Sequence, residues 1–141
     1  MAEFIMKRLV RHAGLENEFE IASAAISDEE EGNPVYPLAK RKLAEHGIGC
    51  PGKTARQITP DDYSHYDMIV AMDEGNIRGL ARFFGNDPEG KFSRLLDHVP
   101  PTDVKHHGRD IADPWYTRKF DVAYDDISTG CQALFEELVK H

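Results

Sequence analysis

The sequence predicts an α/β fold in which helices cover both faces of a small parallel sheet, and three observations lead to that prediction. Apolar residues recur at helical spacing near both ends of the chain, over residues 2–13 and 120–138. Residues 68–72 (MIVAM) form an unbroken apolar run, typical of a strand buried on both faces of a parallel sheet. Helical and strand-like segments alternate along the chain, which favours right-handed crossovers over such a sheet.

Local signals define the individual elements. Helices over 2–13 and 34–46 are expected to end at Gly14 and Gly47, because glycine readily closes a helix. Thr59 followed by Pro60 and two acidic residues predicts the start of a short helix. We also expect helices over 74–83 and 117–139, strands over 19–26, 68–72 and 92–99, and an irregular loop over 100–115.

Composition excludes several classes of protein. The 141 residues, about one domain in length, include 17 Lys and Arg against 25 Asp and Glu, a formal net charge of −8. This charge argues against nucleic acid or an anionic membrane surface as the main partner. No apolar run approaches the ~18 residues of a membrane span. Cys50 and Cys131 are too few for a disulfide framework, so we expect free thiols and a cytoplasmic protein.

Residues 47–54 (GIGCPGKT) match the phosphate-loop pattern G-x-x-x-x-G-K-[ST]. Such a loop must leave a buried strand and enter a helix, so that its backbone N–H groups converge on phosphate. A charged helical segment precedes this match and Pro60 follows it closely. The favoured interpretation is therefore a capped helix and a turn, and a nucleotide-binding protein that uses residues 47–54 is the least favoured alternative.

The other cysteine and histidine patterns favour structural roles. Cys50 and Arg56 fit the spacing C-x-x-x-x-x-R of cysteine phosphatases, but no strand is expected before Cys50, so we interpret it as a residue of a surface turn. Cys131 lies on the apolar face of the last helix and is expected in the core. His106 and His107 lack a third ligand at a suitable spacing, so we expect solvated loop histidines and no metal site. Residues 28–31 are expected to form a solvated acidic loop.

Residues 110–116 (DIADPWY) are the most informative local sequence. Asp113, followed by proline in a loop, is placed to donate a proton to a leaving group, while Trp115 and Tyr116 contact an aromatic substrate. From these residues alone, a turn aspartate beside a partly buried tryptophan is the favoured interpretation, and the proton donor is the alternative.

Several segments together resemble the low-molecular-weight protein tyrosine phosphatases, and they occur in the order seen in that family. They are residues 1–7 (MAEFIMK), the glycine-ended helix before 46–48 (HGI), 55–59 (ARQIT), 68–80 (MIVAMDEGNIRGL) and 113–127 (DPWYTRKFDVAYDDI). The resemblance runs nearly end to end. It implies a three-layer α/β sandwich whose small parallel sheet has four strands in the order 2-1-3-4.

The resemblance also implies a mechanism and a set of site residues. In the family, a loop thiolate attacks phosphorus to form a phosphocysteine, and an aspartic acid protonates the departing phenolate and then activates water. Asp113 matches that acid, and Trp115 and Tyr116 match the aromatic positions beside the phosphoaryl ring. Glu29 and Glu30 fall on the second wall of the cleft, where they should disfavour acidic phosphopeptides. The implied substrates are phosphotyrosine proteins or small aryl phosphates, with no cofactor.

Met1 aligns just after the family's first strand and its C-x-x-x-x-x-R-S/T-P loop. We therefore expect residues 1–141 to be an N-terminally truncated phosphatase domain that lacks the nucleophilic cysteine and the phosphate-binding arginine. Such a chain should be inactive and should be able to self-associate through the gap left by the strand. A non-catalytic remnant that binds a phosphorylated ligand or a partner is the main alternative.

Overall fold

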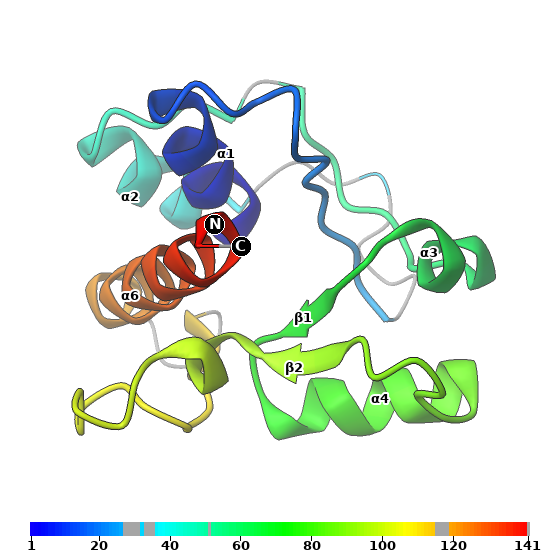
Figure 1. Ribbon diagram of the computed structural model, residues 1–141. Coiled ribbons are helices and arrows are strands. Elements are labelled where there is room, and N and C mark those ends of the chain that lie inside the picture. Colours follow the sequence, from blue (N-terminus) through cyan, green and yellow to red (C-terminus); the bar gives the residue numbers. More distant parts are fainter. Residues whose placement is uncertain (27–31, 33–35, 51, 115–118, 141) are drawn as a thin grey trace.

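The computed structural model describes residues 1–26, 32, 36–50, 52–114 and 119–140, and shows helices arranged around a short parallel sheet (Figure 1). The predicted α/β fold class is confirmed. The elements in chain order are α1 (Ala2–His12), α2 (Pro37–Glu45), α3 (Pro60–His65), β1 (Ile69–Ala71), α4 (Glu74–Phe84), β2 (Phe92–Arg94), the 3-10 helix η1 (Leu95–His98) and α6 (Phe120–Val139).

The helices form where the sequence predicts them, because their end signals act locally. Thr59 and Asp62 form a reciprocal capping box at the start of α3. Asp73 caps α4 by accepting a hydrogen bond from the Asn76 N–H at 2.7 Å. Gly14, just beyond α1, has a φ of +73°, a conformation that glycine adopts without strain.

The sheet consists of β1 and β2, paired in parallel with Ile69 opposite Phe92. The predicted strand over 92–99 is only partly correct, since it ends at Arg94 and continues as η1. Asp97 explains the change, because its carboxylate accepts a hydrogen bond from the Arg94 N–H at 3.0 Å and closes a helical turn there.

The strand predicted over 19–26 is wrong. Residues 19–24 have no regular secondary structure, and Ala25 makes only an isolated parallel bridge with Gln57. At this bridge the Ala25 N–H donates to the Arg56 carbonyl at 2.8 Å, and the Ala25 carbonyl accepts from the Ile58 N–H at 2.7 Å. A strand needs a partner along its length. In the described part of the chain, a cavity rather than a second strand lies beside residues 19–24.

Helix α6 organises the core by packing against α1, α2 and η1, whereas α4 packs against β1 and β2 on the other side of the sheet (Figure 1). The main cluster includes Ile5, Leu43, Leu95, Leu96, Ile127, Cys131 and Leu134. The core position predicted for Cys131 is confirmed, since the residue is 2 % exposed. None of the helices in the described ranges is both long enough and apolar enough to cross a membrane.

Gly130 allows α6 to approach η1 closely. A Cβ atom at Gly130 would lie 2.5 Å from Cγ of Leu95, which is itself almost fully buried. We therefore expect Gly130→Ala to lower the free energy of unfolding by about 1–3 kcal/mol through overpacking. Urea denaturation measures the change, with Gln132→Ala, exposed on the same helix, as the control. Equal stability of the two variants would contradict this close packing.

Candidate active site

A cavity of about 980 Å³ opens between residues 18–26, strand β1 and helix α6. Most of its wall is apolar and comes from α1, β1, α4, η1 and α6, through Met6, Val70, Leu80, Leu95, Ile127 and Leu134. Asp113 is one of the polar residues of the wall. The cavity therefore combines a large apolar interior with a titratable side chain, Asp113, in its wall.

Backbone groups of two segments face this cavity from opposite sides. The Ile69 N–H donates to the Lys91 carbonyl at 3.0 Å, so Ile69 uses the edge of β1 that pairs with β2. In a parallel ladder, the hydrogen-bonding groups of successive residues point to alternate edges of the strand. The N–H and C=O of Val70 therefore point to the opposite edge, where Val70 lines the cavity. On the other side, Ala25 pairs with residues 56–58, which leaves Ala24 facing the cavity. Two strand-like edges thus border the same space.

Asp113 reaches the cavity because the loop before it is attached to the carboxyl end of β1. The Ile111 N–H donates to the Met72 carbonyl at 2.9 Å. Asp110 accepts hydrogen bonds from the Glu74 N–H at 2.9 Å and from Arg94 at 3.1 Å, which joins the loop to the start of α4. Asp113, two residues beyond Ile111, is exposed. It therefore lies at an open part of the cavity wall, accessible to a ligand.

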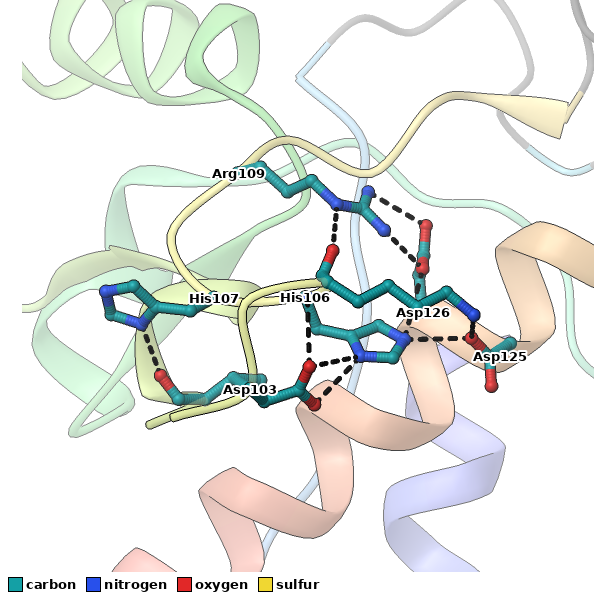
Figure 2. Close-up of polar contacts among 8 residues, drawn as sticks. Asp103, His106, His107, Arg109, Asp125 and Asp126 are labelled. Carbon is teal, nitrogen blue, oxygen red and sulfur yellow. Dashed lines mark hydrogen bonds and ion pairs between the residues drawn. The ribbon is translucent and has the colours of Figure 1, made fainter. Parts of the chain in front are cut away.

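The same loop is attached to α6, which the sequence did not indicate (Figure 2). His106 is buried between Asp103 and Asp125, so the expectation of a solvated histidine is wrong for this residue. His107 is exposed as expected, and its Nδ1 donates to the Val99 carbonyl at 2.5 Å. Asp103 lies three residues earlier in the same loop, but Asp125 lies on α6, so local spacing carries no sign of that second contact.

The acidic groups around His106 are paired with the His106 ring and with the guanidinium of Arg109. Ligand atoms of His106, Asp125 and Asp126 lie within 4.8 Å of one another, a separation that a metal ion would span. Both oxygens of Asp126, however, accept hydrogen bonds from Arg109. Both ring nitrogens of His106 face carboxylates. The cluster is therefore an ion-pair network.

Both cysteines are buried. Cys131 is 2 % exposed, and burial raises the pKa of its thiol to about 12. Cys50 is 7 % exposed and belongs to the main core cluster, so the expectation of a surface turn is wrong for this residue. A reactive cysteine is a partly exposed thiolate in electropositive surroundings. Neither thiol has that environment.

The phosphate-loop match at 47–54 lacks the structure that such a loop requires. Helix α2 precedes it where a strand is needed, and the next helix, α3, begins only at Pro60. The lysine of the pattern, Lys53, forms an ion pair with Glu3 at 2.7 Å. The nucleotide-binding alternative is therefore contradicted by the arrangement of the described residues on both sides of the match.

Glu3 is a charged residue that the sequence analysis missed. It is 7 % exposed and accepts hydrogen bonds from Lys7 and Ser23, both at 2.7 Å, in addition to its ion pair with Lys53. Burial would raise the pKa of this carboxyl, but the bonds from Lys53, Lys7 and Ser23 outweigh it and lower the pKa to about 2. Glu3 therefore stays ionised at ordinary pH and ties the start of α1 to residues 23 and 53.

Four of the predicted site residues, Trp115, Tyr116, Glu29 and Glu30, lie outside the described residues. The predicted acidic loop over 28–31 lies outside them as well. Of the predicted site, the structure therefore places Asp113.

An α/β fold with an acidic side chain at the carboxyl end of a parallel strand, beside a large cavity, is the arrangement of enzymes that bind small ligands at the edge of an open sheet. Comparison with known proteins identifies the family. The family model described as low molecular weight phosphotyrosine protein phosphatase matches residues 1–141. The low molecular weight protein-tyrosine-phosphatase YfkJ of Bacillus subtilis is 35 % identical over 140 residues, which are 99 % of this chain and 87 % of that protein. A low molecular weight phosphotyrosine protein phosphatase of Gallus gallus is 33 % identical, covering 97 % of this chain and 85 % of that protein.

Comparison with solved structures leads to the same family. The crystal structure of YfkJ superposes with a TM-score of 0.92 at 34 % identity and covers 99 % of this chain and 85 % of its own. A low molecular weight protein tyrosine phosphatase from Streptococcus pyogenes gives a TM-score of 0.82 at 29 % identity, covering 97 % of this chain and 82 % of its own. The chain belongs to the low molecular weight phosphotyrosine protein phosphatase family, as the sequence resemblance predicted.

Proposed function

We propose that this chain carries the general acid of a phosphatase for phosphotyrosine and related aryl phosphates, in which Asp113 protonates the departing phenolate oxygen. One observation carries the proposal: Asp113 lines the large cavity beside the carboxyl end of β1. Ligands of open parallel sheets bind at that end of the strands. Family membership supplies the reaction class, and this placement supports the role of Asp113.

The assigned chemistry needs a carboxylic acid that is accessible and held in place. A general acid must come within ~2.6–3.2 Å of the oxygen that it protonates. Asp113 is exposed to an incoming ester, while the bond from Ile111 to β1 holds the loop just before it. After the phenol leaves, the resulting carboxylate accepts a proton from the water that attacks phosphorus.

We propose that the four other predicted site residues determine which phosphate esters the site prefers. We propose that Trp115 and Tyr116 contact the aromatic ring of the ester. Glu29 and Glu30, which the family resemblance assigns to the second wall of the cleft, would disfavour acidic phosphopeptides through like-charge repulsion, together with the net charge of −8.

The nucleophile is assigned to a segment outside these 141 residues. The chain has two cysteines, Cys50 and Cys131, and both are buried in the core. The raised pKa of Cys131, caused by burial, keeps its thiol protonated at neutral pH. Because the attacking species in this chemistry is a thiolate, neither residue is suited to the role. We therefore propose that the attacking thiolate is neither of the two cysteines of these 141 residues.

The cavity also supports the assignment of the nucleophile to a segment outside these 141 residues. The edges at Val70 and Ala24 face it from opposite sides, so an extended segment between them would pair with both. Burying apolar side chains against Ile127 and Leu134 would add to its binding. We propose that this space is the place of a central strand, which leads into the thiolate loop.

Among the described residues, β1 has a strand partner, β2, on one edge alone, and this favours a second candidate function. An unpaired strand edge is a template for pairing with another chain. Without the additional segment, the cavity would bind an extended peptide of a partner, or a strand from a second copy of this chain. In that case the protein would be a non-catalytic binding module for a partner or a phosphorylated ligand.

Phosphate release from p-nitrophenyl phosphate tests the proposal. We compare the 141-residue chain with an extended protein, defined as the same chain preceded by the first strand and C-x-x-x-x-x-R-S/T-P loop of a family member. The expected result is no turnover by the chain and clear turnover by the extended protein. The Cys50→Ser variant of the chain is the control.

Two results would contradict the proposal. Turnover by the 141-residue chain that disappears in Cys50→Ser would identify Cys50 as the nucleophile. A folded but inactive extended protein would instead favour the binding module.

A further inference from the structure

The loop that carries Asp113 is attached to α6 by two interactions of different kinds (Figure 2). Arg109 holds Asp126 with two parallel hydrogen bonds, Nη2 to Oδ1 at 2.7 Å and Nη1 to Oδ2 at 3.1 Å. His106 lies between two carboxylates, with Nδ1 2.9 Å from Asp103 and Nε2 2.8 Å from Asp125. The Asp126 side chain is 2 % exposed, so the Arg109 contact is anchored inside the protein.

We propose that Arg109 and His106, bound to Asp126 and Asp125 of α6, are positioning residues that hold Asp113 where it can protonate the leaving group. This inference rests on the proposed function. The four residues form a clamp between the loop and the longest helix of the described chain. Because a misplacement of about 1 Å can reduce the rate ~10²-fold, a proton donor on a loop needs such support.

The clamp completes a set of attachments on two sides of the loop. Ile111 and Asp110 join it to β1 and to the start of α4. Arg109 and His106 join it to α6, which forms another wall of the cavity. Asp113 follows these attachments after one intervening residue. The position of Asp113 therefore depends on the placement of β1 relative to α6. The Arg109–Asp126 pair connects the loop to α6.

Arg109 is the permanent part of the clamp. A guanidinium stays protonated at all ordinary pH, and its fork fits a carboxylate in one orientation. If Arg109 were replaced, the buried Asp126 carboxylate would lose both of these hydrogen bonds and would keep only the His106 ring at 3.7 Å, and weakening the pairing of a buried charge is destabilising. Arg109 also donates from Nε to the Lys105 carbonyl at 2.8 Å, which fixes the loop backbone around it.

His106 is the part that depends on pH. Ionised carboxylates only accept hydrogen bonds, so contacts from both ring nitrogens require the doubly protonated ring. The hydrogen bond with Asp125 raises the pKa of His106 despite the opposing effect of burial, and Asp103 acts in the same direction. The other charged groups near the ring are Asp126, Lys105 and Arg109. The stabilisation is present below a pH of about 6.5 and is lost as the pH rises through the higher folded-state pKa.

The test uses Arg109→Gln in the extended protein, with the 141-residue chain in parallel. Arg82→Gln, the same substitution at an exposed position of α4, is the matched control. Amide hydrogen exchange at Ile111 reports whether the loop stays attached to Met72, and exchange at Cys131 reports global opening. We expect exchange at Ile111 to accelerate about tenfold or more in Arg109→Gln, with a smaller change at Cys131.

A kinetic measurement on the extended protein separates positioning from a loss of folded protein. Phenyl phosphate has a poor leaving group that needs the acid, whereas p-nitrophenyl phosphate depends on it much less. We expect Arg109→Gln to lower kcat for phenyl phosphate about tenfold more than for p-nitrophenyl phosphate. Arg109→Lys, which keeps the charge but not the fork, should fall in between.

The outcomes distinguish this inference from the proposed function. Unchanged exchange at Ile111 in Arg109→Gln, or an equal loss of kcat on both substrates, would overturn the positioning role. If the extended protein has no activity at all, the proposed function fails. Selective acceleration at Ile111 would then still show that the clamp holds the loop.

Discussion

Replacing Asp113 by asparagine in the extended protein is expected to lower kcat for phenyl phosphate by about 10²–10⁴-fold, the usual contribution of a general acid. The amide keeps the shape of the side chain but has no acidic proton to give to the phenolate oxygen. The loss should be clearly smaller with p-nitrophenyl phosphate, whose leaving group departs without protonation. Initial rates over a range of substrate concentrations separate this effect on kcat from any effect on KM.

The matched control is Asp61→Asn, the same substitution at an exposed position in α3, which should leave both rates unchanged. Equal rates for Asp113→Asn and the parent on phenyl phosphate would contradict the assignment of Asp113. The structure would then leave Asp113 as a turn residue beside the cavity, which is the interpretation that the local sequence alone favours.

Filling the cavity should have the second large effect, on the stability and association of the protein. Buried backbone groups without partners cost about 1–3 kcal/mol each, and natural domains are stable by only ~5–15 kcal/mol. We therefore expect the 141-residue chain to unfold with low cooperativity, to aggregate, or to self-associate through the edge of β1. The extended protein should be a monomer with a steep unfolding transition. Light scattering after size exclusion measures the mass, and urea denaturation measures the transition.

A second extension of the same length, with prolines at alternate positions of the strand, is the control. Proline removes the N–H donors that a central strand needs, so this extension should not restore the transition. A steep two-state transition of the monomeric 141-residue chain, unchanged by the extension, would contradict the expectation.

Much of the helical structure could be predicted because its signals are local. The spacing of Phe120, Ile127, Cys131 and Leu134 on one face is sufficient to predict α6, and all four are buried in the structure. The capping box at Thr59 likewise predicts the start of α3 within a single turn. Such features depend on residues within one helix, so a single sequence contains them.

Features that depend on partners distant in the sequence could not be predicted in the same way. The pattern of residues 19–26 is typical of a strand, but a strand forms only beside another strand, and a cavity lies there. His106 contacts Asp125, 19 residues further along the chain. Cys50 lies in a glycine- and proline-rich segment typical of a surface turn, yet it is buried in the core formed with α1 and α6.

The site shows the same division between local motifs and tertiary contacts. Asp113 could be singled out because proline and two aromatic residues follow it directly. Its supports could not, since the Arg109–Asp126 pair joins a loop to a helix across 17 positions of the sequence. Glu3 was missed for a similar reason, because its partners Ser23 and Lys53 lie on two other segments.

Amide hydrogen exchange at Val70 tests most directly whether the cavity is the place of a central strand. Ile69, its neighbour, donates to Lys91 of the segment that pairs with β1 and serves as an internal reference. In the 141-residue chain as a monomer, we predict slow exchange at Ile69 and fast exchange at Val70, because the Val70 N–H faces the cavity. In the extended protein both amides should exchange slowly. Slow exchange at Val70 in the monomeric chain, equal to that at Ile69, would show that this edge already has a partner and would contradict the central claim.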